Sequence, residues 1–123
     1  MLDSILENKV KIHTRDIKLA TYPHTNSRVI VHGVLKDRRY IKVFDVTGTV
    51  KEPGIIHHID VKLIIKPDPL TIEDAKAVMI HVPMTECRTT LDTMEKLKGL
   101  EIKSGFSKNI RDIMGGKKGC THL

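Results

Sequence analysis

The stretch of sequence that decides the fold is IIHHIDVKLIIK, residues 55–66. Every second position from 59 to 65 holds a large aliphatic side chain, namely Ile59, Val61, Leu63 and Ile65. The positions between them begin with polar side chains, namely His58, Asp60 and Lys62. A repeat of two is typical of a β-strand with one apolar and one polar face. The segment therefore predicts a half-buried strand over residues 55–66.

Three more strands are expected before this segment, over residues 10–19, 28–37 and 40–49. In the first of them the apolar parity changes between Ile12 and Ile17, which predicts a bulge near Arg15 and Asp16. Residues 22–27 hold Pro, Asn and Ser and are expected to form a turn. Gly33 lies inside the second strand, where a backbone or a ligand can approach closely.

After the turn expected at residues 67–69, the stretch 70–82 fits either a strand or a helix. Thr71 with Asp74 could cap a helix, but β-branched residues at 72, 78 and 80 favour a fifth strand. Beyond Pro83 the apolar period becomes helical, which predicts a helix from Thr85 to about Lys98 and a second one from residue 106. Gly99 and the pair Gly115–Gly116 are expected to end these two helices.

These elements predict an α+β fold, with an antiparallel sheet of about five strands and two C-terminal helices packed on one face. The chain has 123 residues, 40% of them hydrophobic and 29% charged, which is typical of one globular domain over residues 1–123. The core depends on aliphatic side chains, because the chain has no Trp and only two Phe and two Tyr.

Composition also limits the classes of function. No apolar run approaches the roughly 20 residues that span a bilayer, and the acidic N-terminus is unlike a signal peptide, so we expect a cytoplasmic protein without a membrane partner. The net charge is +6, but the lysines are dispersed and few aromatic side chains could stack on bases. These features disfavour nucleic-acid binding.

The C-terminal residues carry the strongest chemical signal. Cys120 and His122 are two residues apart, so in an extended segment both side chains could bind one metal ion. Cys87 lies near the start of the first expected helix, whose N-terminus favours a thiolate. With Asp60 or His58 as an auxiliary ligand, these residues predict a metal or thiol site, with zinc as the default and iron–sulfur as a second option. The alternative is structural, because free cysteine is among the most buried residues.

A second group of residues is suited to binding an anion. His13 and Arg15 lie on one face of the first expected strand, and an arginine there can clamp a carboxylate or phosphate. His57 falls on the apolar parity of its own strand and joins this group as a ligand-binding candidate. The structural alternative is that Arg15 pairs with Asp37 or Asp16 and fixes the strand register.

Several segments in this order and spacing resemble the bacterial family called domain of unknown function 2889. They are His13-Thr14-Arg15, Gly33-Val34-Leu35-Lys36-Asp37, Ile56-His57, Gly99-Leu100-Glu101-Ile102, Gly105-Phe106 and the stretch 115–123 with Gly115-Gly116 and Cys120-Thr121-His122-Leu123. The resemblance implies that another apolar helix follows this last stretch, so we expect a shortened member that lacks a C-terminal helix. The cysteine positions are also similar to the layout of iron–sulfur scaffold proteins of the NifU/IscU type, without the early cysteine of those proteins.

Three hypotheses follow from the sequence. The first is a metal-binding or thiol-based site formed by Cys87, Cys120 and His122. The second is a non-enzymatic module that binds an anionic small molecule or a partner protein on the sheet face near Arg15 and Gly33. The third is a structural or oligomerising domain, which leaves a homodimer open. The residues do not decide whether the protein is an enzyme.

Overall fold

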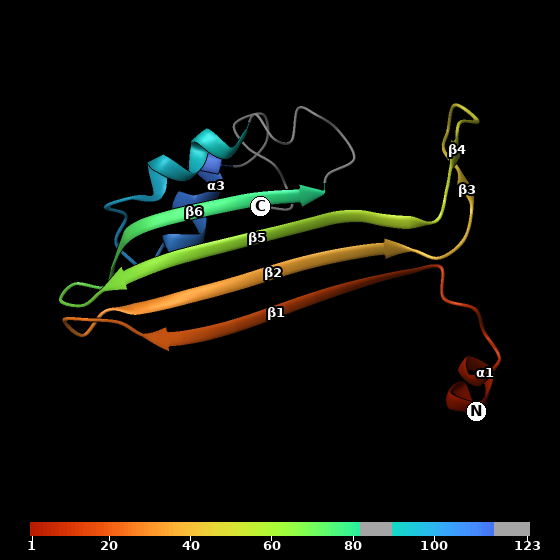
Figure 1. Ribbon diagram of the computed structural model, residues 1–123, viewed down its shortest axis with the longest axis horizontal. Helices are drawn as coiled ribbons and strands as arrows, with labels where there is room; N and C mark the ends of the chain where they lie inside the picture. Colours follow the sequence, from red (N-terminus) through yellow and green to blue (C-terminus); the bar gives the residue numbers. More distant parts are fainter. Residues whose placement is uncertain (82–89, 115–123) are drawn as a thin grey trace.

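The computed structural model describes residues 1–81 and 90–114 (Figure 1). Its centre is a four-stranded antiparallel sheet in the order β1-β2-β5-β6. The strands are β1 (His13–Pro23), β2 (Val29–Arg39), β5 (Gly54–Lys66) and β6 (Thr71–His81). The alternation in residues 55–66 therefore predicted β5 correctly, and β1 and β6 form the two edges of the sheet.

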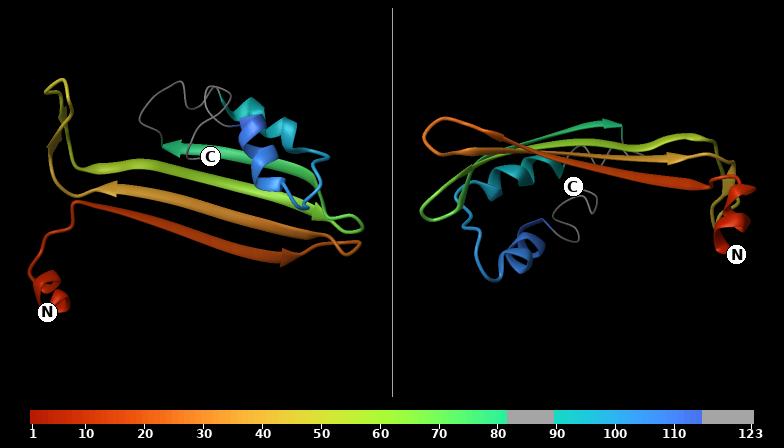
Figure 2. Two further views of the ribbon diagram at one scale, coloured as in Figure 1. Left: turned by 180° about the vertical axis from the view of Figure 1, so that it is seen from behind. Right: turned by 90° about the horizontal axis from the view of Figure 1, so that it is seen from below.

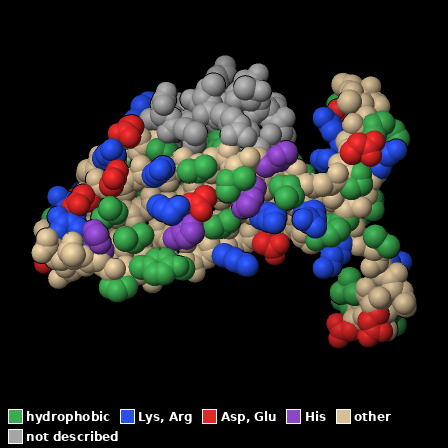
Figure 3. Space-filling model, viewed as in Figure 1, with side chains coloured by type: hydrophobic (Ala, Val, Ile, Leu, Met, Phe, Trp, Pro, Cys, Tyr) green, Lys and Arg blue, Asp and Glu red, His purple; other side chains and the backbone are tan. Residues whose placement is uncertain are grey.

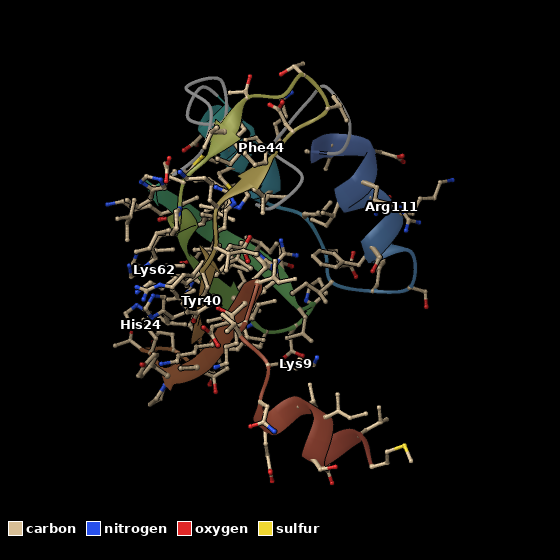
Figure 4. All side chains as sticks on the ribbon, turned by 90° about the vertical axis from the view of Figure 1, so that its right-hand side faces the viewer. Lys9, His24, Tyr40, Phe44, Lys62 and Arg111 are labelled. Carbon is tan, nitrogen blue, oxygen red and sulfur yellow. The ribbon has the colours of Figure 1, made fainter. Side chains whose placement is uncertain are left out.

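The two faces of the sheet differ in what covers them. The helical segments η1 (Thr90–Leu97) and α3 (Phe106–Met114) lie on one face, over the β5–β6 half, and leave the β1–β2 half of that face uncovered (Figure 2). The opposite face, which we call the helix-free face, presents Lys, Arg and His side chains among apolar ones (Figure 3). Lys62 of β5 and Arg111 of α3 accordingly project from opposite sides of the molecule (Figure 4).

The core lies between the β5–β6 half of the sheet and the helical segments. Its buried residues are Ile72, Ala75, Met94 and Leu97. Phe106, Ile110 and Ile113 of α3 pack against this cluster, as the helical stripe predicted. Burial of these aliphatic and aromatic surfaces is the term that holds the helices on the sheet.

The expected third strand, over residues 40–49, is wrong, and the main sheet has four strands where about five were expected. β3 (Val43–Phe44) pairs instead with β4 (Val50–Lys51) in a separate two-stranded hairpin at one end of the sheet (Figure 1). The reason is a turn inside the expected strand. Asp45 Oδ1 accepts hydrogen bonds from the backbone N–H groups of Thr47 (2.8 Å) and Thr49 (3.0 Å). Gly48 there adopts a φ of 81°.

The expected bulge near Arg15 and Asp16 is also wrong. β1 pairs with β2 from His13 to Pro23 without a register shift. Val10 and Ile12, which suggested the change of parity, precede the strand and are exposed. They belong to the arm that joins α1 (Leu2–Glu7) to the sheet. The turn expected after β1 is confirmed, and Asn26 and Ser27 there have φ values of 58° and 61°.

The choice of a strand over a helix for residues 70–82 is confirmed by β6. The helix alternative is wrong, because this stretch pairs with β5 as a strand, within which Asp74 Oδ1 accepts a hydrogen bond from the N–H of Ala75. Gly99 follows η1 with a φ of 85°, as expected for a glycine that ends a helix. The predicted start at Thr85 and the stop at residues 115–116 lie outside the described residues. No helix in the described part of the chain is long and apolar enough to cross a membrane.

Candidate functional site

A row of three charged or polar side chains crosses β1, β2 and β5. The strand register places Arg15 beside Asp37, and Asp37 beside His57. Cross-strand neighbours point to the same face of a sheet. This face is the one that carries the helices, because Ile59 and Val61 follow His57 on the same side of β5 and Val61 packs against the core cluster. His13, one pleat before Arg15, lies on the same face. The structure thus brings together the three residues predicted to bind an anion, and we call His13, Arg15, Asp37 and His57 the polar cluster.

Asp37 is the centre of the polar cluster. Its side chain is only 1% exposed, and its carboxylate accepts hydrogen bonds from Arg15 Nε (2.8 Å) and Arg15 Nη2 (3.0 Å). His57 Nδ1 lies 2.8 Å from Asp37 Oδ2. Because an ionised carboxylate can only accept hydrogen bonds, His57 Nδ1 carries a proton. The structural alternative, in which Arg15 pairs with Asp37, is thus confirmed. The sequence suggested Asp37 only as a pairing partner and not as a residue of the site.

The pKa values follow from these contacts. Hydrogen bonds from Arg15, and then from His57, hold the pKa of Asp37 below its ordinary value and outweigh the opposing effect of burial. The same carboxylate raises the pKa of Arg15. At neutral pH the pair is therefore fully ionised. The buried carboxylate is balanced by a guanidinium rather than left unpaired in a low-dielectric interior.

The cluster has a buried part and an exposed part. The side chain of His57 is 9% exposed, whereas those of Arg15 and His13 are 45% and 44% exposed. His13 Nε2 lies 3.8 Å from Asp37 Oδ1. Arg15 uses Nε and Nη2 for Asp37, so its remaining N–H groups face the solvent side of the cluster. An incoming anion would meet Arg15 and His13.

An apolar hollow begins one pleat beyond the polar cluster on the same face. The next row across the three strands is Ile17, Leu35 and Ile59, and the row after that is Leu19, Gly33 and Val61. These residues line an open hollow of about 270 Å³. Ile17 is 62% and Leu19 74% exposed, although both side chains are fully apolar. Within the described residues, η1 and α3 cover the β5–β6 half of this face and leave the hollow accessible.

Gly33 shapes the floor of the hollow. A Cβ atom at this position would lie 3.0 Å from Leu19 Cδ2, so the leucine leans over the space that the missing side chain leaves. The sequence predicted a close approach at Gly33, and the approaching group is a side chain from the neighbouring strand. The hollow and the polar cluster together form the candidate site.

The predicted metal ligands are not brought together within the described residues. His58 and Asp60 do share the helix-free face, but Asp60 is already engaged by His32 Nε2 at 2.7 Å and Lys62 Nζ at 2.8 Å. The hydrogen bond from Lys62 is the largest cause that lowers the pKa of Asp60. No group of three His, Cys, Asp or Glu side chains in the described part of the chain could hold a metal ion. Cys87, Cys120 and His122 lie outside the described residues, so their convergence stays a prediction.

The fold and the site define a class of protein: a half-covered antiparallel sheet with a polar cluster and an apolar hollow on its partly open face. The family model described as "Protein of unknown function (DUF2889)" matches residues 13–123. The chain belongs to this family, and the resemblance found in the sequence is confirmed. No curated protein and no solved structure matches the chain, and the likeness to iron–sulfur scaffold proteins has no support.

Proposed function

We propose that this domain binds a small amphipathic anion, an apolar chain with a carboxylate at one end, on the helix side of its sheet. The observation that carries the proposal is the adjacency of the hollow and the polar cluster. The row of Arg15, Asp37 and His57 lies one pleat from the row of Ile17, Leu35 and Ile59. Two residues along a strand span roughly 7 Å, so a chain in the hollow would bring its carboxylate within reach of Arg15.

The dimensions and the chemistry both fit such a ligand. A hollow of about 270 Å³ is near the lower end of ligand pockets, which hold roughly 300 Å³ or more. Its lining residues are apolar, and the polar cluster with the Arg15 guanidinium lies at one end. Arginine binds carboxylates through two parallel hydrogen bonds. The guanidinium of Arg15 is already oriented by Asp37, which lowers the entropy lost on binding.

The test is an NMR titration with octanoate, 1-octanol and acetate as probes, in the presence of a chelator. We expect octanoate to shift the amide signals of Ile17, Gly33 and Leu35, with 1-octanol weaker and acetate weakest. Retention of binding with the chelator present separates this proposal from the metal hypothesis. If octanoate leaves these signals unchanged, or shifts signals from residues on the helix-free face alone, the proposal is wrong.

Two variants sharpen the experiment. Gly33→Ala narrows the floor of the hollow, and the group it meets is the exposed end of Leu19, which can move aside. Displacing two methylene groups of the ligand costs roughly 1.6 kcal/mol, so octanoate should bind somewhat more than tenfold more weakly. The double variant Arg15→Gln/Asp37→Asn removes the guanidinium without leaving a buried carboxylate unpaired. It should abolish the preference for octanoate over 1-octanol.

Lys62→Gln/Asp60→Asn is the matched control. Lys62 is also a cation on the sheet, but it lies on the helix-free face and pairs with Asp60. This double variant removes one cation and one carboxylate and leaves the net charge of the chain unchanged, as Arg15→Gln/Asp37→Asn does. Octanoate binding that changes equally in the control would show an effect that is not specific to the polar cluster, and it would count against the proposal.

A further inference from the structure

The two edges of the sheet differ in how they are protected. Along β6 the pairing with β5 has two register irregularities, and the start of its outer edge is occupied by the segment after η1. There Gly99 N–H donates to the Ile72 carbonyl (2.7 Å), and Ile72 N–H donates to the Leu100 carbonyl (3.0 Å). Within the described residues, β1 has neither a register irregularity nor a segment bonded to its outer edge. It pairs with β2 along eleven residues without a shift. An open, regular edge of this length is a template for another strand.

The backbone groups that β1 offers can be assigned from two hydrogen bonds. Tyr40 N–H donates to the Ile12 carbonyl just before β1, and His24 N–H donates to the Arg28 carbonyl just after it, both at 2.9 Å. Both bonds continue the register of β1 with β2, and both use even-numbered positions of the β1 segment. Because hydrogen-bonded positions alternate in an antiparallel ladder, the odd-numbered residues direct their N–H and C=O groups to the open edge. Five of them offer both groups, namely His13, Arg15, Ile17, Leu19 and Thr21, whereas Pro23 has no N–H.

We propose that β1 pairs with β1 of a second copy of this chain, antiparallel and centred on Ile17. The two four-stranded sheets would then join into one continuous sheet. The five odd-numbered positions of each strand supply about ten interchain hydrogen bonds in this register. Ile17, exposed in the single chain, would lie beside the partner's Ile17.

Charge selects this register over its neighbours. Centring on Ile17 places Asp16 opposite the partner's Lys18, and Lys18 opposite the partner's Asp16. These are non-hydrogen-bonded pairs, whose side chains approach most closely. Centring on Asp16 would oppose two aspartates, and centring on Lys18 would oppose two lysines. A lysine on an edge strand usually prevents pairing, but here it gains a carboxylate partner.

The same register adds a residue to the candidate site. Arg15 and Leu19 are symmetric about Ile17, so the partner's Arg15 would lie beside Leu19 on the helix side of the sheet. Each apolar hollow would then have one guanidinium from its own chain at one end and one from the second copy along its edge. The pairing itself depends on the edge strand and does not require any ligand. Its failure would leave the proposed binding of an amphipathic anion intact.

The test uses the mass of the protein in solution and two variants of opposite charge. We expect the wild type to sediment as a dimer that dissociates on dilution. Lys18→Asp places two carboxylates opposite the partner's two, and Asp16→Lys does the same with ammonium groups. Exchanging two favourable cross-strand pairs for two unfavourable ones should weaken each homodimer about tenfold or more. An equimolar mixture of the two variants restores complementary pairs and should recover a heterodimer.

Lys76→Glu is the control, because this exposed lysine changes the charge of the helix-free face far from β1. A wild type that stays monomeric at high concentration overturns the proposal. So does a dimer that neither variant weakens, or variants that fail to associate when mixed although each is folded. Hydrogen exchange on the wild type gives an independent reading. The amides of the odd-numbered β1 residues should become protected as concentration rises, and unchanged exchange there would equally overturn the pairing.

Discussion

Replacing Asp37 with asparagine tests whether the polar cluster stabilises the fold. The variant keeps the shape of the side chain but removes its charge and replaces one acceptor oxygen with an NH2 donor, so Arg15 and His57 are left with a single neutral acceptor. Hydrogen bonds to a charged group contribute about 1.5–3 kcal/mol each. Arg15 is 45% exposed and can turn to water, whereas Asp37 and His57 are buried. We therefore expect Asp37→Asn to lower the free energy of unfolding by about 2–3 kcal/mol at neutral pH.

The stabilisation by Asp37 should depend on pH, and the direction of its pKa shift sets the direction of that dependence. The pKa of Asp37 is lower in the folded chain than its ordinary value, which is about 3.9 in an unfolded chain. A lowered pKa stabilises the fold above the unfolded value, and that stabilisation is lost as pH falls through the folded value. The difference in the free energy of unfolding between the wild type and Asp37→Asn should thus have its full size above about pH 5 and shrink below about pH 4.

Urea unfolding monitored by circular dichroism at several pH values measures this difference. Glu73→Gln is the control, because Glu73 also accepts a short hydrogen bond from an arginine, Arg28 Nε at 2.7 Å, but in an exposed position. Such surface pairs contribute about 0–1 kcal/mol. Equal losses in the two variants, or an Asp37→Asn deficit that persists unchanged into acid, would refute the assignment of stability to the buried carboxylate.

Two further outcomes are expected. Asp45→Ala removes the acceptor of the bonds from Thr47 and Thr49, so their amides should exchange faster, while the amides of β2 and β5 keep their protection. Unchanged exchange at Thr47 would contradict the turn that explains the β3–β4 hairpin. For Cys87, Cys120 and His122, the metal hypothesis predicts near-stoichiometric zinc in protein purified without a histidine tag, and its loss in Cys120→Ser. A low metal content that is the same in both proteins would contradict the hypothesis.

Strands with a strict alternation were predictable because period two and burial on one face reinforce each other. In β5 the alternation from Ile59 to Ile65 leaves one arrangement that buries the aliphatic side chains. β6 was predictable for a related reason, since its β-branched residues resist a helix. The stripe of Phe106, Ile110 and Ile113 likewise gave α3, because the same side chains that set the period form the contact with the core.

The failures occurred where a local hydrogen bond outweighed a weak pattern. Residues 40–49 alternate well enough to suggest a sheet strand, but the carboxylate of Asp45 folds the chain back after two residues of β3. The sequence Asp45-Val46-Thr47-Gly48 carries the signal of such a turn, with an aspartate that bonds forward and a glycine that accepts a positive φ. In β1, the change of parity between Ile12 and Ile17 suggests a bulge only if the strand includes residues 10–12, and these three residues precede it.

The candidate site shows a different limit of sequence reasoning. The side chains of His13, Arg15 and His57 each suit an anion, but nothing in the sequence fixes which rows the three strands share. That information lies in the register of β1 with β2 and of β2 with β5, which depends on contacts distant along the chain. The apolar hollow depends on the same register, because Gly33 creates space only when Leu19 and Val61 are its neighbours.

Register and site are therefore set by the same residues. If β1 slipped by one position, Arg15 would move to the helix-free face, and Asp37 would lose its guanidinium within the interior of the sheet. His57 would remain as a hydrogen-bond partner, but a buried carboxylate without its balancing guanidinium is far more costly than a misplaced aliphatic side chain, so the polar cluster penalises the wrong register more strongly than the apolar rows do. A charged row that served register alone could lie anywhere along the sheet. Within the described residues this row lies at the end of an uncovered apolar hollow and leaves Arg15 half exposed, and that position is the reason to propose a ligand for it as well as a structural role.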